Sequence, residues 1–447
     1  MATNPQQDFV LKTIKSRDVH FVRFWFTDVL GAMKSFAIIP SELDDAFNQG
    51  MGFDGCCIEG FSAGHEYDVR AYPDAETFQV LPWRPSEDAV GRMFCDICMP
   101  DGQPFEGDPR RVLLRIVEHA QKKGYVFNVG PELEFYYFRD AKSAEPLDRG
   151  GYFDLTSLDS ASDLRRDTIL TLEKMGIPVE YSHHEIGPGQ QEIDLRFTDA
   201  MSMADAVMTY KLVVKEIAAK HGFFASFMPK PLSDQPGSGM HVHQSLFDFE
   251  GNNLFYDEND PQGYALSKLA KHYIAGLLKY APEFTLVTNQ NVNSYKRMVA
   301  GNEAPTYLSW ARHNRSTLVR VPGYRPNCEN SCRVELRSPD PSCNPYLAFA
   351  CMLGAGLKGI EDELELQEPT EMQDLFLLSR QELRKQGIAT LPDSLGEAVE
   401  LFAGSQLMKD ILGEHIHTYL VEAKRKEWNE YQGSVTQWER DKYLAVL

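Results

Sequence analysis

The sequence predicts an α+β protein in which two separate sheets are accompanied by helices. Three observations support this fold class. The first hundred or so residues contain several β-type runs and short helical patterns. In the middle of the chain, several strands alternate apolar residues with glutamate, histidine or arginine, and the chain beyond residue 363 reads as mostly helical. A chain of 447 residues is long enough for two or three domains with a large core.

The composition is that of a soluble globular protein, and it excludes several classes of partner. Hydrophobic residues make up 43% of the chain and charged residues 25%. The formal net charge of -20 argues against nucleic acid or an anionic membrane as the main partner, because both would repel an acidic surface. No apolar run is long enough to span a bilayer, and the chain does not begin with the apolar core of a signal peptide. We therefore expect a cytoplasmic protein.

We expect the N-terminal region to form a small sheet with a helix. The β-type runs 19–26 and 32–39 are joined by Asp28–Gly31, which is typical of a hairpin. The other expected elements are a helix over 6–17, a helix over 41–47 capped by Ser41, a loop over 53–61 and a strand over 92–99. A boundary near Gly107 then gives an N-terminal domain of residues 1–107 and a larger domain of residues 108–447.

The larger domain is expected to alternate strands with helices before it becomes mostly helical. Expected strands cover 130–138, 179–184, 190–197, 240–246 and 333–337. Expected helices cover 108–123, 160–175, 203–220 and 346–363, the last one capped by Asn344-Pro345. Residues 354–359 match the pattern G-x-G-x-x-G, but they lie within a helical stretch and follow no strand. We interpret these glycines as sites of close helix packing.

The strand Gly130–Phe138 carries two carboxylates on one face. Side chains alternate along a strand, so Glu132 and Glu134 share a face while Leu133 and Phe135 share the other. A single Glu-x-Glu pair is commonly the wet face of a surface strand. The alternative is a cation site, because hard divalent cations bind several carboxylate oxygens.

The same alternation recurs in the other strands, which favours a sheet whose polar face lines a cavity. The candidate metal ligands on these strands are Glu132, Glu134, Glu185, Glu192, His241 and Glu335. Converging carboxylates repel one another unless cations or protons neutralise them. Oxygen ligands with one imidazole suit Mg²⁺ or Mn²⁺ better than Zn²⁺, so we expect two or more such ions. The alternative, that these are unrelated surface residues, remains open on spacing alone.

Arginines are interleaved with these acids and indicate an anionic substrate. They are Arg297, Arg315, Arg320, Arg333 and Arg337. A guanidinium group binds phosphate or carboxylate through two hydrogen bonds, although a single arginine is more often a surface ion-pair partner. No G-x-x-x-x-G-K-[ST] loop occurs in the sequence. Metals and arginines without such a loop fit phosphoryl transfer by electrostatic stabilisation.

Motifs spread in order over nearly the whole chain resemble those of class I glutamine synthetases of the shorter type. These are Asp54-Gly55, Pro131-Glu132-Leu133-Glu134-Phe135, His184-Glu185, Phe227-Met228-Pro229-Lys230-Pro231, Gly237-Ser238-Gly239-Met240-His241, Asn293-Ser294-Tyr295-Lys296-Arg297, Glu303-Ala304-Pro305, Asn314-Arg315-Ser316 and Asn344-Pro345-Tyr346-Leu347. The resemblance implies a β-grasp N-terminal domain and a catalytic domain built on a curved antiparallel β-sheet with surrounding helices. It also implies a homo-dodecamer of two hexameric rings, with each active site between neighbouring subunits.

The resemblance implies a reaction in which ATP phosphorylates the γ-carboxylate of glutamate and ammonia then displaces the phosphate. By motif, Glu134, Glu185 and Glu192 resemble the ligands of one metal ion. Glu132, His241 and Glu335 resemble those of a second ion that bridges to the nucleotide phosphates. Arg297, Arg337 and Gly237 correspond to glutamate-binding positions, and Arg315 to the arginine that stabilises the transferring phosphoryl group.

The remaining roles implied by the resemblance concern the nucleotide and the amine. Nucleotide contacts are expected from Glu180, Phe197, His243, Ser245, Arg320 and Arg333. Asp54 is expected to bind ammonium and accept its proton, with Tyr152 and Glu185 beside it. Glu303 is expected in a flap that closes over the acyl phosphate, since water would hydrolyse that intermediate.

The sequence departs from the family pattern at three places. Cys56 and Cys57 stand where two serines usually follow Asp-Gly, and Pro236 stands where an asparagine usually contacts glutamate. Residues 322–332 form a stretch that is longer than usual. These departures leave open a γ-glutamyl ligase that uses a polyamine or ethanolamine, and a weakly active structural homologue is a third alternative. In the segment that best matches the loop that some longer relatives adenylylate, Phe376 takes the place of the modified tyrosine. Phenylalanine has no hydroxyl to modify, so we expect no such control here.

Overall fold

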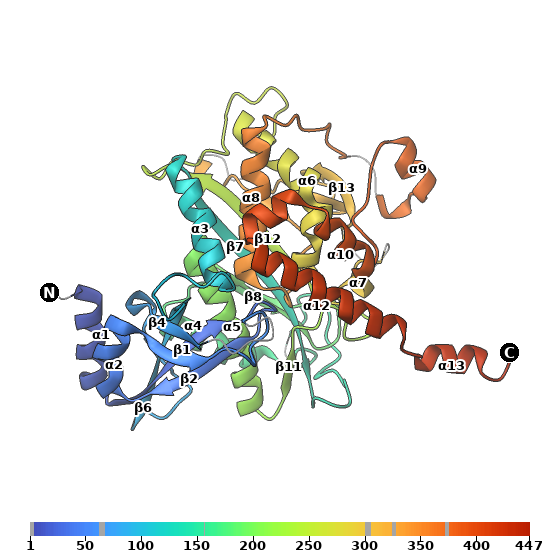
Figure 1. Cartoon of the computed structure of the whole chain (residues 1–447). Helices are drawn as coiled ribbons and strands as arrows, with labels where there is room; N and C mark the ends of the chain where they lie inside the picture. Colours follow the sequence, from blue (N-terminus) through green and yellow to red (C-terminus); the bar gives the residue numbers. More distant parts are fainter. Residues whose placement is uncertain (1–3, 62–67, 156, 300–304, 324–327, 372–374) are drawn as a thin grey trace.

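The structure is a computed structural model that describes residues 4–61, 68–155, 157–299, 305–323, 328–371 and 375–447. A small sheet formed by the N-terminal residues lies beside a larger sheet that is surrounded by helices (Figure 1). Each sheet has its own cluster of buried hydrophobic residues. The α+β fold class is confirmed. The domain boundary at residue 107 stays a prediction.

The N-terminal sheet has six strands in the order β2-β1-β6-β4-β3, with β5 paired to β6. The strands are β1 (Val19–Thr27), β2 (Met33–Ile38), β3 (Met51–Asp54), β4 (Asp68–Pro73), β5 (Gln79–Val80) and β6 (Ala89–Cys98). Its helices are α1 (Pro5–Ser16) and α2 (Leu43–Gln49), with the short 3-10 helices η1 (Pro40–Glu42) and η2 (Ala75–Thr77). The predicted hairpin is confirmed, because β1 and β2 pair antiparallel.

Two expectations for this region are wrong. Ser41 does not cap a helix, because Pro40–Glu42 form η1, which runs directly into α2 without a side-chain cap. The segment 53–61 is not entirely a loop, because Phe53 and Asp54 end strand β3 and pair with β4, which was not predicted. Asp54 therefore stands at the last position of a strand, and the turn that follows it begins with Gly55.

The larger sheet has nine strands in the order β13-β14-β15-β12-β7-β9-β8, and β10 and β11 also pair with β7. They are β7 (Val126–Phe138), β8 (Val179–His184), β9 (Gln190–Leu195), β10 (Thr198–Asp199), β11 (Phe224–Ser226), β12 (Met240–Phe247), β13 (Tyr307–Ala311), β14 (Thr317–Arg320) and β15 (Val334–Leu336). All neighbours pair antiparallel except β13 and β14, which are parallel. The five predicted strands of this region are thus members of one sheet.

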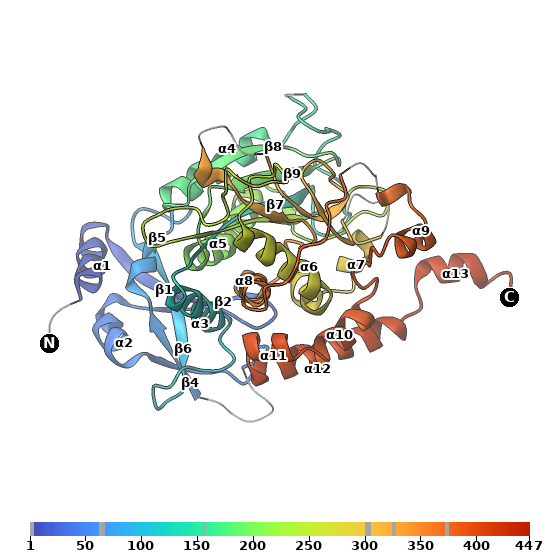
Figure 2. The ribbon, with the colours of Figure 1, turned by 90° about the horizontal axis from the view of Figure 1, so that it is seen from above.

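Helices surround this sheet, and the C-terminal part of the chain is helical as expected (Figures 1 and 2). They are α3 (Pro109–Lys122), α4 (Ser162–Lys174), α5 (Ala200–Lys220), α6 (Lys268–Thr288), α7 (Ser294–Arg297), α8 (Pro345–Glu361), α9 (Arg380–Lys385), α10 (Leu395–Ala403), α11 (Gln406–Leu412), α12 (Glu414–Gln432) and α13 (Gln437–Tyr443), with η3 (Glu329–Ser331) and η4 (Leu375–Leu377). Among the described residues, no helix is both long and apolar enough to cross a membrane.

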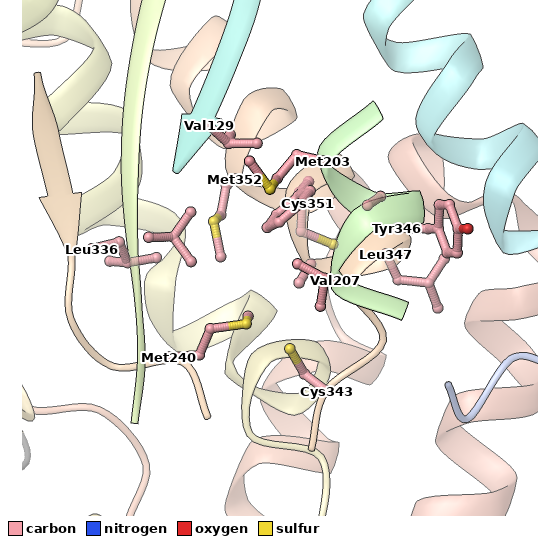
Figure 3. Packing of buried hydrophobic residues seen from close by; sticks show 14 of the residues in the cluster. Val129, Met203, Val207, Met240, Leu336, Cys343, Tyr346, Leu347, Cys351 and Met352 are labelled. Atoms are coloured by element: carbon pink, nitrogen blue, oxygen red, sulfur yellow. The ribbon is translucent and has the colours of Figure 1, made fainter. Parts of the chain in front are cut away.

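Helices α5 and α8 cover the apolar face of the sheet (Figure 3). Val129 of β7, Met240 of β12 and Leu336 of β15 lie in one buried cluster with Val207 of α5 and Met352 of α8. Because side chains alternate along each strand, the residues between these apolar ones point to the opposite face of the sheet. Burial of one face therefore fixes where the glutamates and histidines point.

The glycines of the G-x-G-x-x-G pattern allow α8 to pack closely on neighbouring helices. A Cβ atom at Gly359 would lie 2.3 Å from the backbone oxygen of His272 on α6. At Gly356 it would lie 2.0 Å from the ring of Tyr273. The interpretation of these glycines as packing sites is confirmed.

Charged and capping contacts join the two sheets through α3, α5 and α8. The guanidinium group of Arg110 on α3 donates hydrogen bonds to Asp74 and Asp96, which belong to the N-terminal sheet region, and to Asp205 on α5. The hydroxyl of Tyr346 on α8 also donates to Asp205. We call these five residues the Arg110 cluster. Separately, the Asn344 side chain both caps α8 and donates to two backbone oxygens of the β1–β2 hairpin.

Candidate active site

A cavity of about 650 Å³ opens on the polar face of the large sheet. Most of the predicted site residues line it: Glu132, Glu134, Tyr152, Glu185, Glu192, Gly237, His241, His243, Arg297, Arg315, Arg320, Arg333, Glu335 and Arg337. A single sheet face thus brings together acids, imidazoles and arginines from segments that lie far apart in the sequence.

Strand register explains why these side chains converge. Glu132 of β7 stands opposite His241 of β12, and Glu134 stands opposite Glu192 of β9. On the other side of β12, Glu335 of β15 stands opposite His243. Opposite residues on antiparallel strands have Cβ atoms about 5 Å apart, so each pair shares one patch of the sheet face.

Glu335 is held as a carboxylate by two arginines. Its side chain is fully buried, and it accepts hydrogen bonds from Arg320 and Arg337. Burial acts to raise the pKa of Glu335, but the nearby charge of Arg337, with other positive groups, outweighs it and lowers the pKa to about 2. This group is therefore charged at any physiological pH.

Glu132 bridges the two histidines of β12. One of its oxygens lies 2.7 Å from His243 Nε2 and the other lies 3.3 Å from His241 Nδ1. Burial acts to raise the pKa of Glu132, yet the two imidazoles hold it well below its usual range. Atoms of Glu132, His243 and Glu335 that could bind a metal ion all lie within 4.8 Å of one another.

A second acidic group in the cavity has raised pKa values instead. Burial, reinforced by repulsion from Glu185, raises the pKa of Glu134 to about 8. Burial, with repulsion from Asp194 and Glu134, raises the pKa of Glu192 well above its usual range. Carboxylates with raised pKa values are destabilised as anions, so either protons or a bound cation would be needed to neutralise them.

An adjoining cavity of about 460 Å³ extends along β7, β8 and β12. Three predicted nucleotide contacts, Glu180, Phe197 and Ser245, line this second cavity and not the first. Glu132, Tyr181, His243 and Arg333 line both cavities. The two cavities are therefore neighbours that meet at Glu132 and His243, two members of one candidate metal-binding group.

Arg297 reaches the larger cavity between two glycines. A Cβ atom at Gly239 would lie 2.6 Å from Arg297 Nη2, and one at Gly237 would lie 2.7 Å from its Cγ. The guanidinium group donates to the backbone oxygen of Ser338 at 2.8 Å, which fixes its position. The Gly-Ser-Gly sequence is thus explained by the space that a buried arginine needs.

Two predicted residues are not placed in the cavities. Asp54 is exposed at the end of β3. Among the described residues, it lines neither cavity. Asp54 accepts hydrogen bonds from the backbone N–H and from the thiol of Cys56. Both bonds lower the pKa of this carboxyl group, and the backbone bond has the larger effect. Glu303 lies outside the described residues.

The site also contains residues that the sequence reasoning missed. His183 of β8 lies opposite Glu192, and its Nε2 atom lies 2.8 Å from Glu185. His183, Glu185 and Glu192 form a second group whose ligand atoms lie within 4.8 Å of one another. Gln190 donates to Glu134 at 3.1 Å. The missed signal was the same alternation, because His183 and Gln190 stand two residues before Glu185 and Glu192.

Comparisons with known proteins agree with this architecture. Residues 18–100 match the family "Glutamine synthetase, beta-Grasp domain", and residues 106–443 match "Glutamine synthetase, catalytic domain". Glutamine synthetase of Mycolicibacterium smegmatis is 51% identical over 447 residues, which cover 99% of each chain. That of Methanosarcina mazei is 50% identical over 442 residues, which cover 98% of this chain and 97% of the relative.

Solved structures show the same fold. "GmaS/ADP complex-Conformation 1" has a TM-score of 0.88 at 30% sequence identity and covers 97% of this chain and 99% of its own. A small β-grasp sheet beside a large sheet with an acid-lined cavity defines a class of ligases, the glutamine synthetase family, to which this chain belongs. Its length of 447 residues is consistent with class I members.

Proposed function

We propose that this enzyme uses ATP to ligate ammonia to the γ-carboxylate of L-glutamate, giving glutamine, ADP and phosphate. One observation carries the proposal: the acid-lined cavity and the neighbouring cavity share Glu132, His243 and Arg333. A nucleotide in the smaller cavity would direct its phosphates toward the acids and arginines of the larger one. A related fold is named as an ADP complex, which supports this use of the smaller cavity. We place the reaction in the cytoplasm.

The donor set fits divalent cations. Carboxylate oxygens and imidazole nitrogens gather in two groups, and the raised pKa values of Glu134 and Glu192 mark carboxylates that lack a counter-charge. Glu134, Glu185 and Glu192 would hold one ion, and Glu132, His241 and Glu335 another, with His183 and His243 as additional candidates. Bound Mg²⁺ or Mn²⁺ supplies positive charge that neutralises phosphate oxygens during transfer.

The chain's own residues have distinct tasks in the reaction. Arg297, Arg337 and the Gly237 backbone orient glutamate, while Arg315 stabilises charge on the transferring phosphoryl group. A glutamate γ-carboxylate oxygen attacks the terminal phosphorus and ADP leaves. Ammonium gives a proton to Asp54, with Tyr152 and Glu185 beside it, and ammonia then displaces phosphate from the acyl carbon. Glu303 covers the acyl phosphate, and Glu180, Phe197, His243, Ser245, Arg320 and Arg333 hold the nucleotide.

Asp54 requires a partner subunit in this proposal. It is exposed on the edge strand of its own N-terminal sheet and, among the described residues, it lines neither cavity of its own chain. A ring in which the Asp54 loop of one subunit faces the cavity of the next would complete each site. We therefore propose the homo-dodecamer of two hexameric rings as the active form.

A second candidate, a γ-glutamyl ligase for a larger amine, is favoured by two departures. Pro236 lines the larger cavity where the family pattern has a side-chain donor, and Cys57 is a poorer hydrogen-bond partner than serine. Asp54, Tyr152 and Glu185 nevertheless supply the acceptors that ammonium needs, which favours ammonia.

The deciding experiment measures phosphate release with glutamate, ATP, Mg²⁺ and a panel of amines. We expect kcat/KM for ammonia to exceed the values for putrescine, spermine and ethanolamine, and Cys57→Ser to improve ammonium binding only modestly. A preference for any larger amine that Cys57→Ser shifts back toward ammonia would establish the second candidate. Absence of phosphate release with every amine would favour a structural homologue.

A further inference from the structure

Two neighbouring thiols follow Asp54 in the turn after β3. Cys56 and Cys57 are both exposed, and their sulfur atoms lie 3.6 Å apart. The Cys56 thiol donates to Asp54 Oδ2 at 3.1 Å, and the backbone N–H of Cys56 donates to Asp54 Oδ1 at 2.8 Å. The carboxylate that we assign to the amine is thus held by the first cysteine of the pair.

We propose that Cys56 and Cys57 form a reversible dithiol–disulfide site that lowers amine ligation when it is oxidised. The oxidant is a low-molecular-weight disulfide such as oxidised glutathione. Cys57 Sγ, as a thiolate, attacks one sulfur of this disulfide, forms a mixed disulfide and releases one glutathione thiolate. Cys56 then loses its proton, attacks Cys57 Sγ and releases the second glutathione. Two protein thiols are oxidised, and one external disulfide is reduced to two thiols.

The order of attack follows from the contacts of Cys56. Hydrogen bonding to Asp54 is the largest cause that raises the pKa of Cys56, to about 12, so this thiol keeps its proton in the resting protein. Cys57 is therefore the first nucleophile, and Cys56 closes the ring after its proton passes to Asp54 or to water. Asp54 is the nearest carboxylate acceptor for that proton.

The resulting bond is expected to be easily reduced. Cα atoms of neighbouring residues are about 3.8 Å apart across a trans peptide, whereas most disulfides join Cα atoms about 4.4–6.8 Å apart. A disulfide between neighbours is consequently strained, and strained or exposed disulfides are the labile ones. Both thiols are exposed, so a reductant can reach the bond.

Formation of the Cys56–Cys57 disulfide would change the hydrogen bonds that Asp54 accepts. A disulfide sulfur has no hydrogen to donate, so Asp54 would keep the backbone bond from Cys56 and lose the thiol bond. Loss of one hydrogen bond at a positioned carboxylate corresponds to about a tenfold change. This activity effect rests on the proposed function of Asp54, whereas disulfide formation itself does not.

The test measures disulfide formation and ligation activity separately. Reduced protein is incubated over a series of oxidised-to-reduced glutathione ratios, and the peptide that contains both cysteines is measured by mass spectrometry without reduction. We expect this peptide to lose two hydrogens, ligation with ammonia to fall about tenfold in kcat/KM in parallel, and dithiothreitol to reverse both. Persistent glutathione on Cys57 without ring closure, or closure that leaves kcat/KM unchanged, would overturn the proposal.

Matched variants show which cysteines cause the loss of activity on oxidation. The double variant Cys56→Ser, Cys57→Ser is expected to ligate and to resist oxidation, while Cys98→Ser, which removes a half-buried thiol of β6, should respond as the unaltered protein does. Equal loss of activity in the double variant would assign the sensitivity to another cysteine. If the reduced protein ligates no amine at all, the proposed function fails, and the mass measurement still decides whether the disulfide forms.

Discussion

Glu134 and Glu335 point from the same sheet face, but the pKa of Glu134 is raised and that of Glu335 is lowered. Glu335 lies between two arginines, and the charge of Arg337 overcomes the effect of burial, so that its pKa is about 2. Glu134 is also buried, but Glu185 lies near it and its pKa is about 8. Identical side chains thus differ because their neighbours differ in charge. Without metal ions at neutral pH, one is a carboxylate and the other a carboxylic acid.

This difference predicts how pH acts on the metal-free protein. Glu134 keeps its proton up to about pH 8 in the folded protein, whereas an unfolded chain releases it near pH 4.5. The folded state therefore binds more protons in this window, and the free energy of unfolding falls as pH rises from about 5 to about 8. Saturating Mg²⁺ should reduce this fall, because the cation replaces the protons. Urea unfolding of chelator-treated protein across this range, with and without Mg²⁺, measures both effects.

The matched variant for this prediction is Glu134→Gln. It keeps the shape of the side chain and cannot titrate, so the difference between Mg²⁺ and chelator should shrink and become less dependent on pH. Mg²⁺ stabilisation that is equal at about pH 5 and about pH 8 would contradict the linkage between this carboxyl group and the cation.

The alternation of apolar and polar side chains along each strand predicted most of the site residues. Glu132, His241 and Glu335 were found because each stands between apolar neighbours, and one buried sheet face then forces them together. The same rule, applied backward from Glu185, would have found His183. Asp54 is different, since the pattern of one chain says nothing about which surface of a partner subunit it would face in the proposed oligomer.

At the scale of elements, close packing between α6 and α8 depends on glycine. A Cβ atom at Gly359 would lie 2.3 Å from a backbone oxygen of α6 and 2.7 Å from the Cα of Gly276. Backbone atoms cannot move aside as a flexible side chain can, so Gly359→Ala should force the helices apart. We expect destabilisation of about 1–3 kcal/mol, despite the better helix propensity of alanine.

Gly404→Ala is the matched control. Gly404 is the C-cap residue that follows α10, with a φ of −81°. Its added Cβ would meet only ordinary contacts, the nearest at 3.6 Å. The urea midpoint of this variant should stay within experimental error of the unaltered protein, while that of Gly359→Ala falls. Equal midpoints for both variants would mean that the helices adjust more easily than their geometry indicates.

Several elements escaped sequence prediction for identifiable reasons. Helix α6 is buried on most of its surface and contains Pro282, so it lacks the amphipathic period and continuous propensity that mark a surface helix. Strands β13 and β14 have consecutive buried residues and do not alternate. Strand β4 does alternate buried and less buried residues, so the signal for this strand was present but was missed. Alternation finds strands with one polar face and misses those that are buried on both.

At the scale of the whole molecule, shared sites between subunits can be tested by complementation. Asp54→Asn and Glu335→Gln should each abolish phosphate release, the first by removing the proton acceptor and the second by removing a buried charge. If every site combines Asp54 of one subunit with Glu335 of the next, mixed oligomers of the two variants should regain up to about a quarter of the original activity. The measurement is phosphate release after the variants are dissociated and reassembled together.

Two controls make this result specific. Each variant reassembled alone should stay inactive, and the size of every oligomer should equal that of the unaltered protein. Activity that stays absent in correctly sized mixed oligomers would mean that Asp54 and Glu335 of the same chain serve one site. The mixed-oligomer arrangement would then be wrong even if the chemistry is right.

The Arg110 cluster has a consequence for how this chain can be recombined. A chimaera that joins residues 1–107 of one relative to residues 108–447 of another would separate Asp74 and Asp96 from the arginine that they surround. The contact of Asn344 with the hairpin is more permissive, because backbone oxygens are the acceptors and any residue supplies them. The Asn344 contact therefore sets no side-chain requirement on its two acceptor residues, whereas the two acids and Arg110 have to be inherited together.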